Sequence, residues 1–178
     1  MAQTQKLNAL VVDDHNLVRQ SLITLLSSRF LNISFDDAMN GNAAYEKIIA
    51  AKPDILYTDI QMPQGNGDDL LERLVNESIF IPNIVLTFNL NPSLQNARAL
   101  FYSQRMYTLQ QRMYLGITLM QANSPQDYLN QIINSQQEID TVTRIINNAG
   151  FSAFEKGSDV KILVEKTRLI LYKIYGIR

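Results

Sequence analysis

Five side chains in this sequence are of the types that bind divalent metal ions and phosphate groups, and each lies at or just after the end of a short apolar run. They are Asp13, Asp14, Asp59, Thr87 and Lys156. Ligands of open α/β sheets gather at the carboxyl ends of the strands. If the apolar runs are parallel strands, three carboxylates, one hydroxyl and one amine therefore share one edge of a sheet.

Three carboxylates at one edge repel one another and need a positive counter-ion. A hard divalent cation such as Mg²⁺ suits this role, because it binds carboxylate oxygens and retains several waters. A carboxylate is also able to act as the nucleophile in phosphoryl transfer, forming an aspartyl phosphate. In that chemistry the cation neutralises developing charge, and a lysine and a hydroxyl hold the remaining phosphoryl oxygens. The five residues therefore predict a Mg²⁺-dependent phosphoryl acceptor.

The elements that must position these residues alternate between strands and amphipathic helices. Short apolar runs predict strands at 7–12, 33–39, 54–59, 83–88 and 151–154. Apolar residues at helical spacing predict helices at 15–29, 41–51, 70–75, 139–148 and 159–175. Such alternation is typical of an α/β protein with a doubly wound parallel sheet, covered by helices on both faces.

The segment between the fourth and fifth predicted strands is longer than a parallel crossover requires. If 139–148 is the ordinary crossover helix, residues 90–137 are an addition to a single domain that spans 1–178. The added segment is rich in Gln and Asn, and it carries QRMY at 104–107 and again at 111–114. A seven-residue interval keeps side chains on one helix face. We therefore expect 90–137 to form a helical hairpin or arm.

The composition excludes several other kinds of site. The chain has no cysteine and one histidine, His15, which excludes thiol nucleophiles, Cys-ligated metal centres and multi-histidine metal sites. Because His15 begins a predicted helix, we expect it to have a surface or capping role. A net charge of −1 with no basic run argues against nucleic-acid binding. Without a long apolar run or a leader pattern, a soluble cytoplasmic protein with no membrane association is expected.

Four segments resemble the receiver domains of two-component response regulators. They are VVDDHNLVR (11–19), YTDIQMPQGNG (57–67), IVLT (84–87) and AGFSAFEKGSD (149–159). The resemblance implies a CheY-like, flavodoxin-like sheet of five parallel strands in the order 2-1-3-4-5. Residues 90–137 are then a helical insertion between the fourth and fifth strands.

The resemblance also implies how the acidic residues divide their roles. Asp59 is the expected phosphoacceptor, Asp14 the direct ligand of Mg²⁺, and Asp13 a ligand that acts mainly through water. Gln61 is expected to contribute a backbone carbonyl. The implied metal site therefore consists of Asp13, Asp14, Asp59 and Gln61.

Two further residues complete the implied site around Asp59. The Thr87 hydroxyl is expected to hydrogen-bond one phosphoryl oxygen, and Lys156 is expected to pair with another. The implied donor is a phosphohistidine on a sensor histidine kinase or a histidine phosphotransfer protein. The protein itself is not expected to be an enzyme. Because the chain ends soon after the last predicted helix, we expect it to signal through protein–protein contacts.

A second interpretation stays open beside the first. The sparse charge and the Met and Tyr residues of 90–137 are typical of a helical face that must be buried. A degenerate receiver-like module that dimerises through 90–137, independently of phosphorylation, is therefore the alternative. A bulky Phe88 beside Thr87 is expected to narrow access to Asp59. A hydrolase is less well supported, because no second acid or base is evident near Asp59.

Overall fold

A computed structural model describes residues 5–88, 94–119, 137 and 153–178 of the chain. Within these residues, parallel strands form one sheet in the order β2-β1-β3-β4-β5. The strands are β1 (Leu7–Val12), β2 (Ile33–Ala38), β3 (Ile55–Asp59), β4 (Asn83–Thr87) and β5 (Ala153–Glu155). The predicted doubly wound sheet and its strand order are confirmed.

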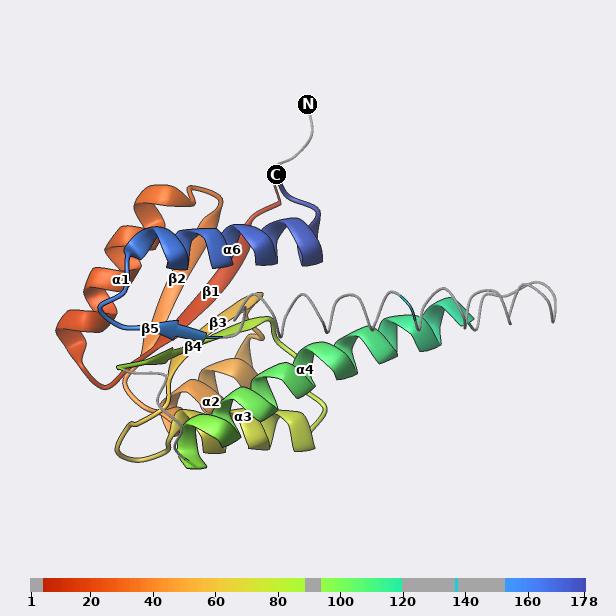
Figure 1. The fold of residues 1–178 in the computed structure, drawn as a ribbon, viewed down its shortest axis with the longest axis horizontal. Coiled ribbons are helices and arrows are strands. Elements are labelled where there is room, and N and C mark those ends of the chain that lie inside the picture. Colours follow the sequence, from red (N-terminus) through yellow and green to blue (C-terminus); the bar gives the residue numbers. More distant parts are fainter. Residues whose placement is uncertain (1–4, 89–93, 120–136, 138–152) are drawn as a thin grey trace.

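Helices cover both faces of this sheet (Figure 1). They are α1 (Asn16–Arg29), α2 (Gly41–Ala50), α3 (Gly67–Asn76), α4 (Leu94–Leu119) and α6 (Val160–Tyr175). The pair α1 and α6 lies over one face, and α2, α3 and α4 lie over the other. Among the described residues, no helix combines the length and the apolar character that a membrane crossing requires.

The inner strands have near-continuous apolar sequences because helices bury them from both sides. Every residue of β3 and β4 is buried, and the two apolar clusters of the core meet these strands from opposite faces. The edge strand β2 has the more polar sequence ISFDDA and is only partly buried. Burial on both faces therefore explains why the inner strands were the easier ones to predict.

The register of the strand pairs aligns their carboxyl ends at one edge of the sheet. Val12 pairs with Thr58, and Thr87 pairs with Glu155. Asp59 continues β3 by one residue beyond Thr58. The residues that directly follow β1 and β5 therefore lie beside the ends of β3 and β4, where the sequence predicted the site.

Helix α4 is fixed to the core by its first half. Ala99 and Met106 are buried in the apolar cluster on the α2–α3 face. The Tyr107 hydroxyl donates to the Asn83 carbonyl at 2.6 Å and accepts from the Asn83 N–H at 2.7 Å. The Ser103 hydroxyl donates to the Asn83 side chain. Residues 99–107 therefore belong to the helical layer that the sheet requires.

This packing concerns the first part of the predicted insertion at 90–137, which stays a prediction. The sequence assigned all of 90–137 to an addition, and the structure uses the first half of α4 as the domain's own helix after β4. The first QRMY segment supplies core residues, so its apolar side chains do not mark an arm. The predicted crossover helix at 139–148 lies outside the described residues, as do residues 120–136. An insertion beyond α4 stays a prediction.

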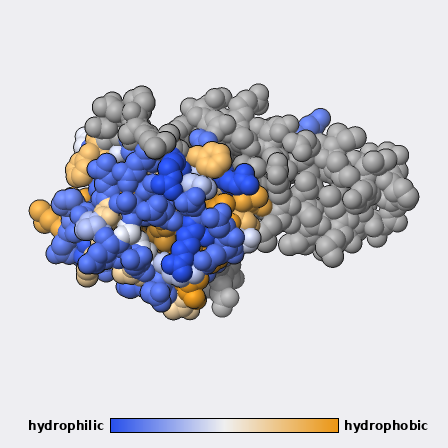
Figure 2. Space-filling view, turned by 90° about the horizontal axis from the view of Figure 1, so that it is seen from below, coloured by the Kyte–Doolittle hydropathy of each residue, from blue (hydrophilic) through white to orange (hydrophobic). Residues whose placement is uncertain are grey.

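Charged side chains hold α3 to its neighbours. Arg98 of α4 lies 2.8 Å from Asp68 and 2.7 Å from Glu72 of α3. The Arg73 guanidinium stacks 3.3 Å from the centre of the Tyr45 ring of α2. Figure 2 shows that this face of the molecule is mostly hydrophilic over its described residues, with small apolar spots among them. The polar groups of this layer therefore neutralise one another at the helix contacts.

Candidate phosphoacceptor site

The structure brings four of the predicted site residues to one edge of the sheet. Asp13 follows β1, Asp59 ends β3, Thr87 ends β4 and Lys156 follows β5. Asp13, Asp59 and Thr87 are almost fully buried, with exposed fractions of 0%, 2% and 6%. Asp14 is partly exposed beside them. The prediction that these residues lie close together is thus confirmed as geometry, and their roles in phosphoryl transfer stay predictions.

Lys156 joins the two buried carboxylates. Its Nζ lies 2.6 Å from Asp13 Oδ2 and 3.0 Å from Asp59 Oδ2. Its backbone N–H donates to the Thr87 carbonyl, which continues the pairing of β4 with β5 into the loop. A backbone bond and two ion pairs therefore fix the ammonium group between β1 and β3.

The polar atoms at this edge are close together but incompletely hydrogen-bonded. Asp13 Oδ2, Asp14 Oδ1, Asp59 Oδ2 and Lys156 Nζ are buried, and none has an aligned hydrogen bond to another described residue. The ion pairs of Lys156 meet the distance but not the alignment of a hydrogen bond. Ligand atoms of Asp13, Asp14, His15 and Asp59 all lie within 4.8 Å of one another. Carboxylate oxygens this close together, with one ammonium group among three carboxylates, fit a divalent cation.

Burial raises the pKa of Asp59 above its ordinary value. Removing a carboxylate from water disfavours its charged form, and the neighbouring charge of Asp13 acts in the same direction. The ammonium group of Lys156 opposes both effects, as does the Ile60 N–H, which donates to Asp59 Oδ1 at 2.8 Å. A further positive charge at this site would favour the ionised, nucleophilic form of Asp59.

Gly67 allows the loop after β3 to fold back on the site. Its N–H donates to the Ile60 carbonyl at 2.8 Å. A Cβ atom at this position would lie 1.8 Å from the Asp59 carbonyl oxygen, which is far inside van der Waals contact. A glycine is therefore required here by the close approach to the backbone of the site.

Arg19 is a positioning residue that the sequence did not reveal. Its side chain is nearly buried, and its Nη1 donates to the Asp13 carbonyl at 2.7 Å. Its Nε pairs with Asp37 at the end of β2. The guanidinium therefore holds the turn after β1 against β2. The only sequence signal was an arginine one helical turn into the helix that follows the acidic pair.

Gln61 lies in the loop after β3 and is exposed. Its side-chain amide donates to the Gln95 side chain at 3.3 Å, and the Gln95 amide donates to Asp68 at 3.2 Å. This chain of amides links the site loop to the first turn of α4. The metal-binding role predicted for the Gln61 backbone carbonyl stays a prediction.

Phe88 stands at the rim of the site. The centre of its ring lies 4.5 Å from Lys156 Nζ and 6.0 Å from the ring of His15, and 59% of the residue is exposed. A cationic nitrogen over an aromatic face is attracted to it. Phe88 therefore lies over the Lys156 ammonium, and its predicted effect on access to Asp59 stays a prediction.

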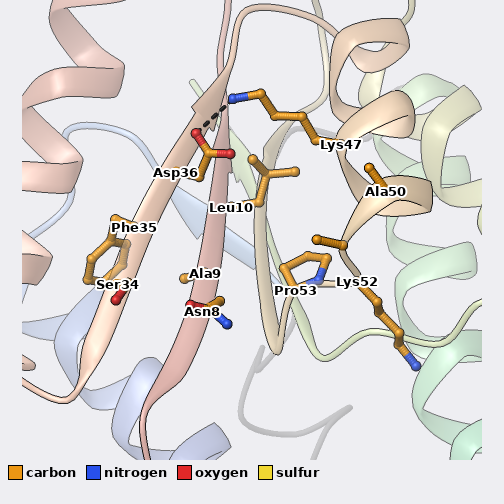
Figure 3. A pocket seen from close by; sticks show the side chains of 11 residues that line it. Asn8, Ala9, Leu10, Ser34, Phe35, Asp36, Lys47, Ala50, Lys52 and Pro53 are labelled. Carbon is orange, nitrogen blue, oxygen red and sulfur yellow. Dashed lines mark hydrogen bonds and ion pairs between the residues drawn. The ribbon is translucent and has the colours of Figure 1, made fainter.

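One hollow formed by described residues adjoins the site, and another lies away from it. Figure 3 shows the other, between β1, β2 and the end of α2, with Leu10 and Phe35 in its lining and an ion pair of 2.7 Å between Lys47 and Asp36. None of the predicted site residues lines this hollow. The hollow beside the site lies between α1 and the start of α6, and its lining includes Lys156.

A parallel sheet in the order β2-β1-β3-β4-β5, flanked by helices on both faces, defines the CheY-like class of the flavodoxin fold. The sequence pattern of the response regulator receiver domain matches residues 9–102, which is more than half of the chain. The chain therefore belongs to the response regulator receiver domain family.

Individual relatives match less than half of the chain. An uncharacterized response regulatory protein of Vibrio parahaemolyticus is 40% identical over 73 residues, which are 41% of this chain and 30% of that protein. A protein-glutamate methylesterase/protein-glutamine glutaminase of Treponema denticola is 33% identical over 84 residues, which are 47% of this chain and 22% of that protein. The chain thus spans less than a third of the length of these relatives.

Solved structures show the same fold. The signal receiver domain of an HD domain-containing protein from Pseudomonas fluorescens has a TM-score of 0.51 and 25% identity, and the match covers 58% of this chain and 74% of that one. A LuxR-family DNA-binding response regulator from Staphylococcus aureus has a TM-score of 0.50 and 22% identity, covering 54% and 79% of the two chains. The likeness to the LuxR-family regulator shows the fold alone.

Proposed function

We propose that the protein is a phosphoacceptor of a two-component or phosphorelay pathway, and that Asp59 receives the phosphoryl group. The observation that carries this proposal is the position of Lys156 Nζ between Asp13 Oδ2 and Asp59 Oδ2. An ammonium group placed there is within reach of an oxygen of any phosphoryl group attached to Asp59. Membership of the receiver family supports the same role.

Mg²⁺ is the proposed cofactor, and its ligands are the carboxylates of Asp13, Asp14 and Asp59 with the carbonyl of Gln61. When bound, the cation would neutralise charge on the transferring phosphoryl group. The fit rests on the burial of Asp13 and Asp59 and on the ligand atoms of the three aspartates, which lie within 4.8 Å of one another. Asp13, which also pairs with Lys156, would act mainly through water.

The reaction at Asp59 is a phosphoryl transfer between two nucleophiles. An Asp59 carboxylate oxygen forms the new bond to phosphorus as the bond from phosphorus to the donor nitrogen breaks, and the donor leaves with that electron pair. The Lys156 ammonium then exchanges part of its contact with Asp13 for a phosphoryl oxygen. The Thr87 hydroxyl donates to another phosphoryl oxygen. The added group brings about −1.5 to −2 charge to the edge of the sheet.

The proposed donor is a phosphohistidine on a sensor histidine kinase or a histidine phosphotransfer protein. A relative named hybrid signal transduction histidine kinase D, from Dictyostelium discoideum, is 28% identical over 140 residues, or 78% of this chain and 7% of that protein. The hollow beside Lys156 is lined mainly by apolar side chains, and Leu17 at its edge is 80% exposed. An apolar surface next to the nucleophile favours a protein donor.

We propose a cytoplasmic signalling protein without an enzymatic activity of its own, and without nucleic-acid or membrane partners. Its output would pass through protein–protein contacts, in which the surface of α4 has a part. The near-neutral net charge of −1 supports the absence of an electrostatic nucleic-acid surface.

Acetyl phosphate with Mg²⁺ is expected to add one phosphoryl group to Asp59, and beryllofluoride is expected to bind at the same place. Intact-mass spectrometry and peptide mapping measure the adduct, and amide NMR shifts near Thr87 and Lys156 measure the response. Asp59→Asn is the matched control and is expected to show neither change. A wild-type protein that forms no adduct and shows no shift with beryllofluoride would exclude this function.

We also propose that the protein self-associates through the part of 90–137 that lies beyond the core. Figure 1 shows the second half of α4 extending past the ends of α3 and α6. The sequence of this half is poor in charge and contains Met113 and Tyr114. A long helix with so few charged residues is stabilised mainly by burial against a partner.

Replacing Met113 and Met120 by glutamate is expected to weaken self-association at least about tenfold, because a buried charge costs more than 1.4 kcal/mol. Analytical ultracentrifugation over a range of protein concentrations measures this change. Deleting all of 91–137 is not a suitable test, because it removes the core residues Ala99 and Met106. A wild-type monomer at all concentrations would contradict the proposal, and assembly without any Asp59 adduct would support the alternative of a degenerate module.

A further inference from the structure

His15 turns toward the acidic residues of the site. It is the N-cap residue of α1, but within the described contacts its side chain makes no capping hydrogen bond. Its Nδ1 lies 2.9 Å from Asp14 Oδ1 and 3.5 Å from Asp13 Oδ1. The capping position predicted from the sequence is confirmed for the backbone, while the imidazole ring has a different environment from that of a cap.

His15 supplies the nitrogen beside the Asp14 carboxylate, whereas Asp13 and Asp59 have the ammonium group of Lys156. Lys156 neutralises Asp13 and Asp59, whereas Asp14 forms no ion pair with a lysine or arginine in the described part of the chain. Asp14 Oδ1 is buried and lacks an aligned hydrogen bond from any described residue, although the imidazole nitrogen is 2.9 Å away. His15 Nδ1 and Asp14 Oδ1 are therefore adjacent, and one cation could contact both atoms.

We infer that His15 Nδ1 is a fourth ligand of the divalent cation, and that it shifts the preference of the site from Mg²⁺ toward Mn²⁺, Co²⁺ and Zn²⁺. This inference rests on the cation site of the proposed function. Its geometric basis is the cluster in which ligand atoms of Asp13, Asp14, His15 and Asp59 lie within 4.8 Å of one another. Asp13 and Asp59 are almost fully buried, and Asp14 Oδ1, beside His15 Nδ1, lacks an aligned hydrogen bond from any described residue.

The chemistry of the donor set gives the direction of the shift. Mg²⁺ prefers oxygen ligands and retains its waters, so an imidazole adds little to its affinity. Mn²⁺, Co²⁺ and Zn²⁺ all bind imidazole nitrogen, and Mn²⁺ binds it the most weakly of the three. The rings of His15 and Phe88 meet edge to face, with an angle of 89° between their planes. In this arrangement Nδ1 faces Asp14 Oδ1 at 2.9 Å.

His15 is the only histidine of the chain, so a nitrogen isotope in histidine reports on this residue alone. The full-length protein is labelled with ¹⁵N-histidine and loaded with Mn²⁺, and pulsed electron paramagnetic resonance is used to detect coupling to a directly bound nitrogen. A ¹⁵N coupling is expected in the wild type and not in His15→Ala. Calorimetric titration is expected to show that His15→Ala binds Mn²⁺ and Zn²⁺ about 10- to 100-fold more weakly. Its affinity for Mg²⁺ is expected to change little.

His15→Gln separates a ligand from a hydrogen-bond donor, because glutamine can donate to Asp14 but supplies no imidazole nitrogen. Loss of Mn²⁺ affinity in both variants, with the ¹⁵N coupling in the wild type, would support the inference. Cation binding without a ¹⁵N coupling would overturn it and leave the proposed function intact. A wild-type protein that binds none of these cations would overturn both the inference and the metal site of the proposed function.

Discussion

Lys156→Met is expected to unfold about 3 kcal/mol more easily than the wild type at pH 7 without divalent cations, because it leaves two buried carboxylates without their counter-ion. The wild-type contacts are 2.6 Å to Asp13 and 3.0 Å to Asp59, and the lysine side chain is 8% exposed. Methionine keeps most of the apolar stem, so the difference reports on charge rather than on packing. Urea unfolding in EDTA measures the free energy of unfolding.

The destabilisation of Lys156→Met is expected to shrink as the pH is lowered. The pKa of Asp59 in the folded state is raised by burial, and Lys156 opposes this rise. A carboxyl with a raised pKa stabilises the fold below its unfolded pKa, and that stability is lost as the pH increases through the folded pKa. Without Lys156 the folded-state pKa of Asp59 rises further. The loss of stability that accompanies ionisation of Asp59 therefore continues to higher pH.

A double variant isolates the contact between the lysine and the carboxylates. Asp13→Asn in the Lys156→Met background removes one of the two unpaired charges, and it is expected to recover part of the lost stability. Asp13→Asn alone is expected to destabilise the wild type or leave it unchanged. A Lys156→Met protein that is as stable as the wild type at pH 7 would mean that the ammonium group is not held between Asp13 and Asp59.

Gly67→Ala is expected to cost roughly 3 kcal/mol of stability, because the added methyl group forces the backbone of the site apart. Its Cβ would lie 1.8 Å from the Asp59 carbonyl oxygen and 3.1 Å from the Ile60 Cα. Neither atom belongs to a side chain that is able to move aside. The loop after β3 must therefore shift, and the Asp59 carboxylate shifts with it. Urea unfolding measures the stability, and the acetyl phosphate reaction measures the integrity of the site.

Gly176→Ala is the matched control for this substitution. Gly176 ends α6 with a left-handed φ of 65°, and a Cβ atom there would have no neighbour within 4 Å. Its replacement is expected to cost roughly 1 kcal/mol through backbone conformation alone. Equal costs at the two positions would show that the approach of Gly67 to Asp59 does not determine the stability of the loop.

The strands and the position of the site could be predicted because each depends on a local pattern. Burial on both faces demands an apolar run, so β1, β3 and β4 were recognisable without tertiary information. The carboxyl ends of such strands must meet at one edge, which placed Asp59 and Thr87 together. Both predictions follow from the sequence pattern alone.

The rest could not be predicted because it depends on contacts between residues that are distant in sequence. The role of Gly67 follows from the path of the backbone of Asp59, and the role of Arg19 follows from the carbonyl of Asp13. The packing of Tyr107 against Asn83 could not be predicted either, because nothing in the periodicity of 90–137 separates a core helix from an added one. The edge-to-face contact of His15 with Phe88 likewise joins residues that are distant in sequence.

The contacts that attach α4 to the rest of the domain are spread along its first half. Its first turn reaches the loop after β3 through Gln95 and Gln61, Arg98 pairs with α3, and Tyr107 anchors the helix to the opposite end of β4. Because an α-helix rises about 1.5 Å per residue, Leu119 lies roughly 18 Å beyond the anchor at Tyr107. Any rigid displacement of the packed half would therefore carry the far tip with it, well beyond the body of the domain (Figure 1).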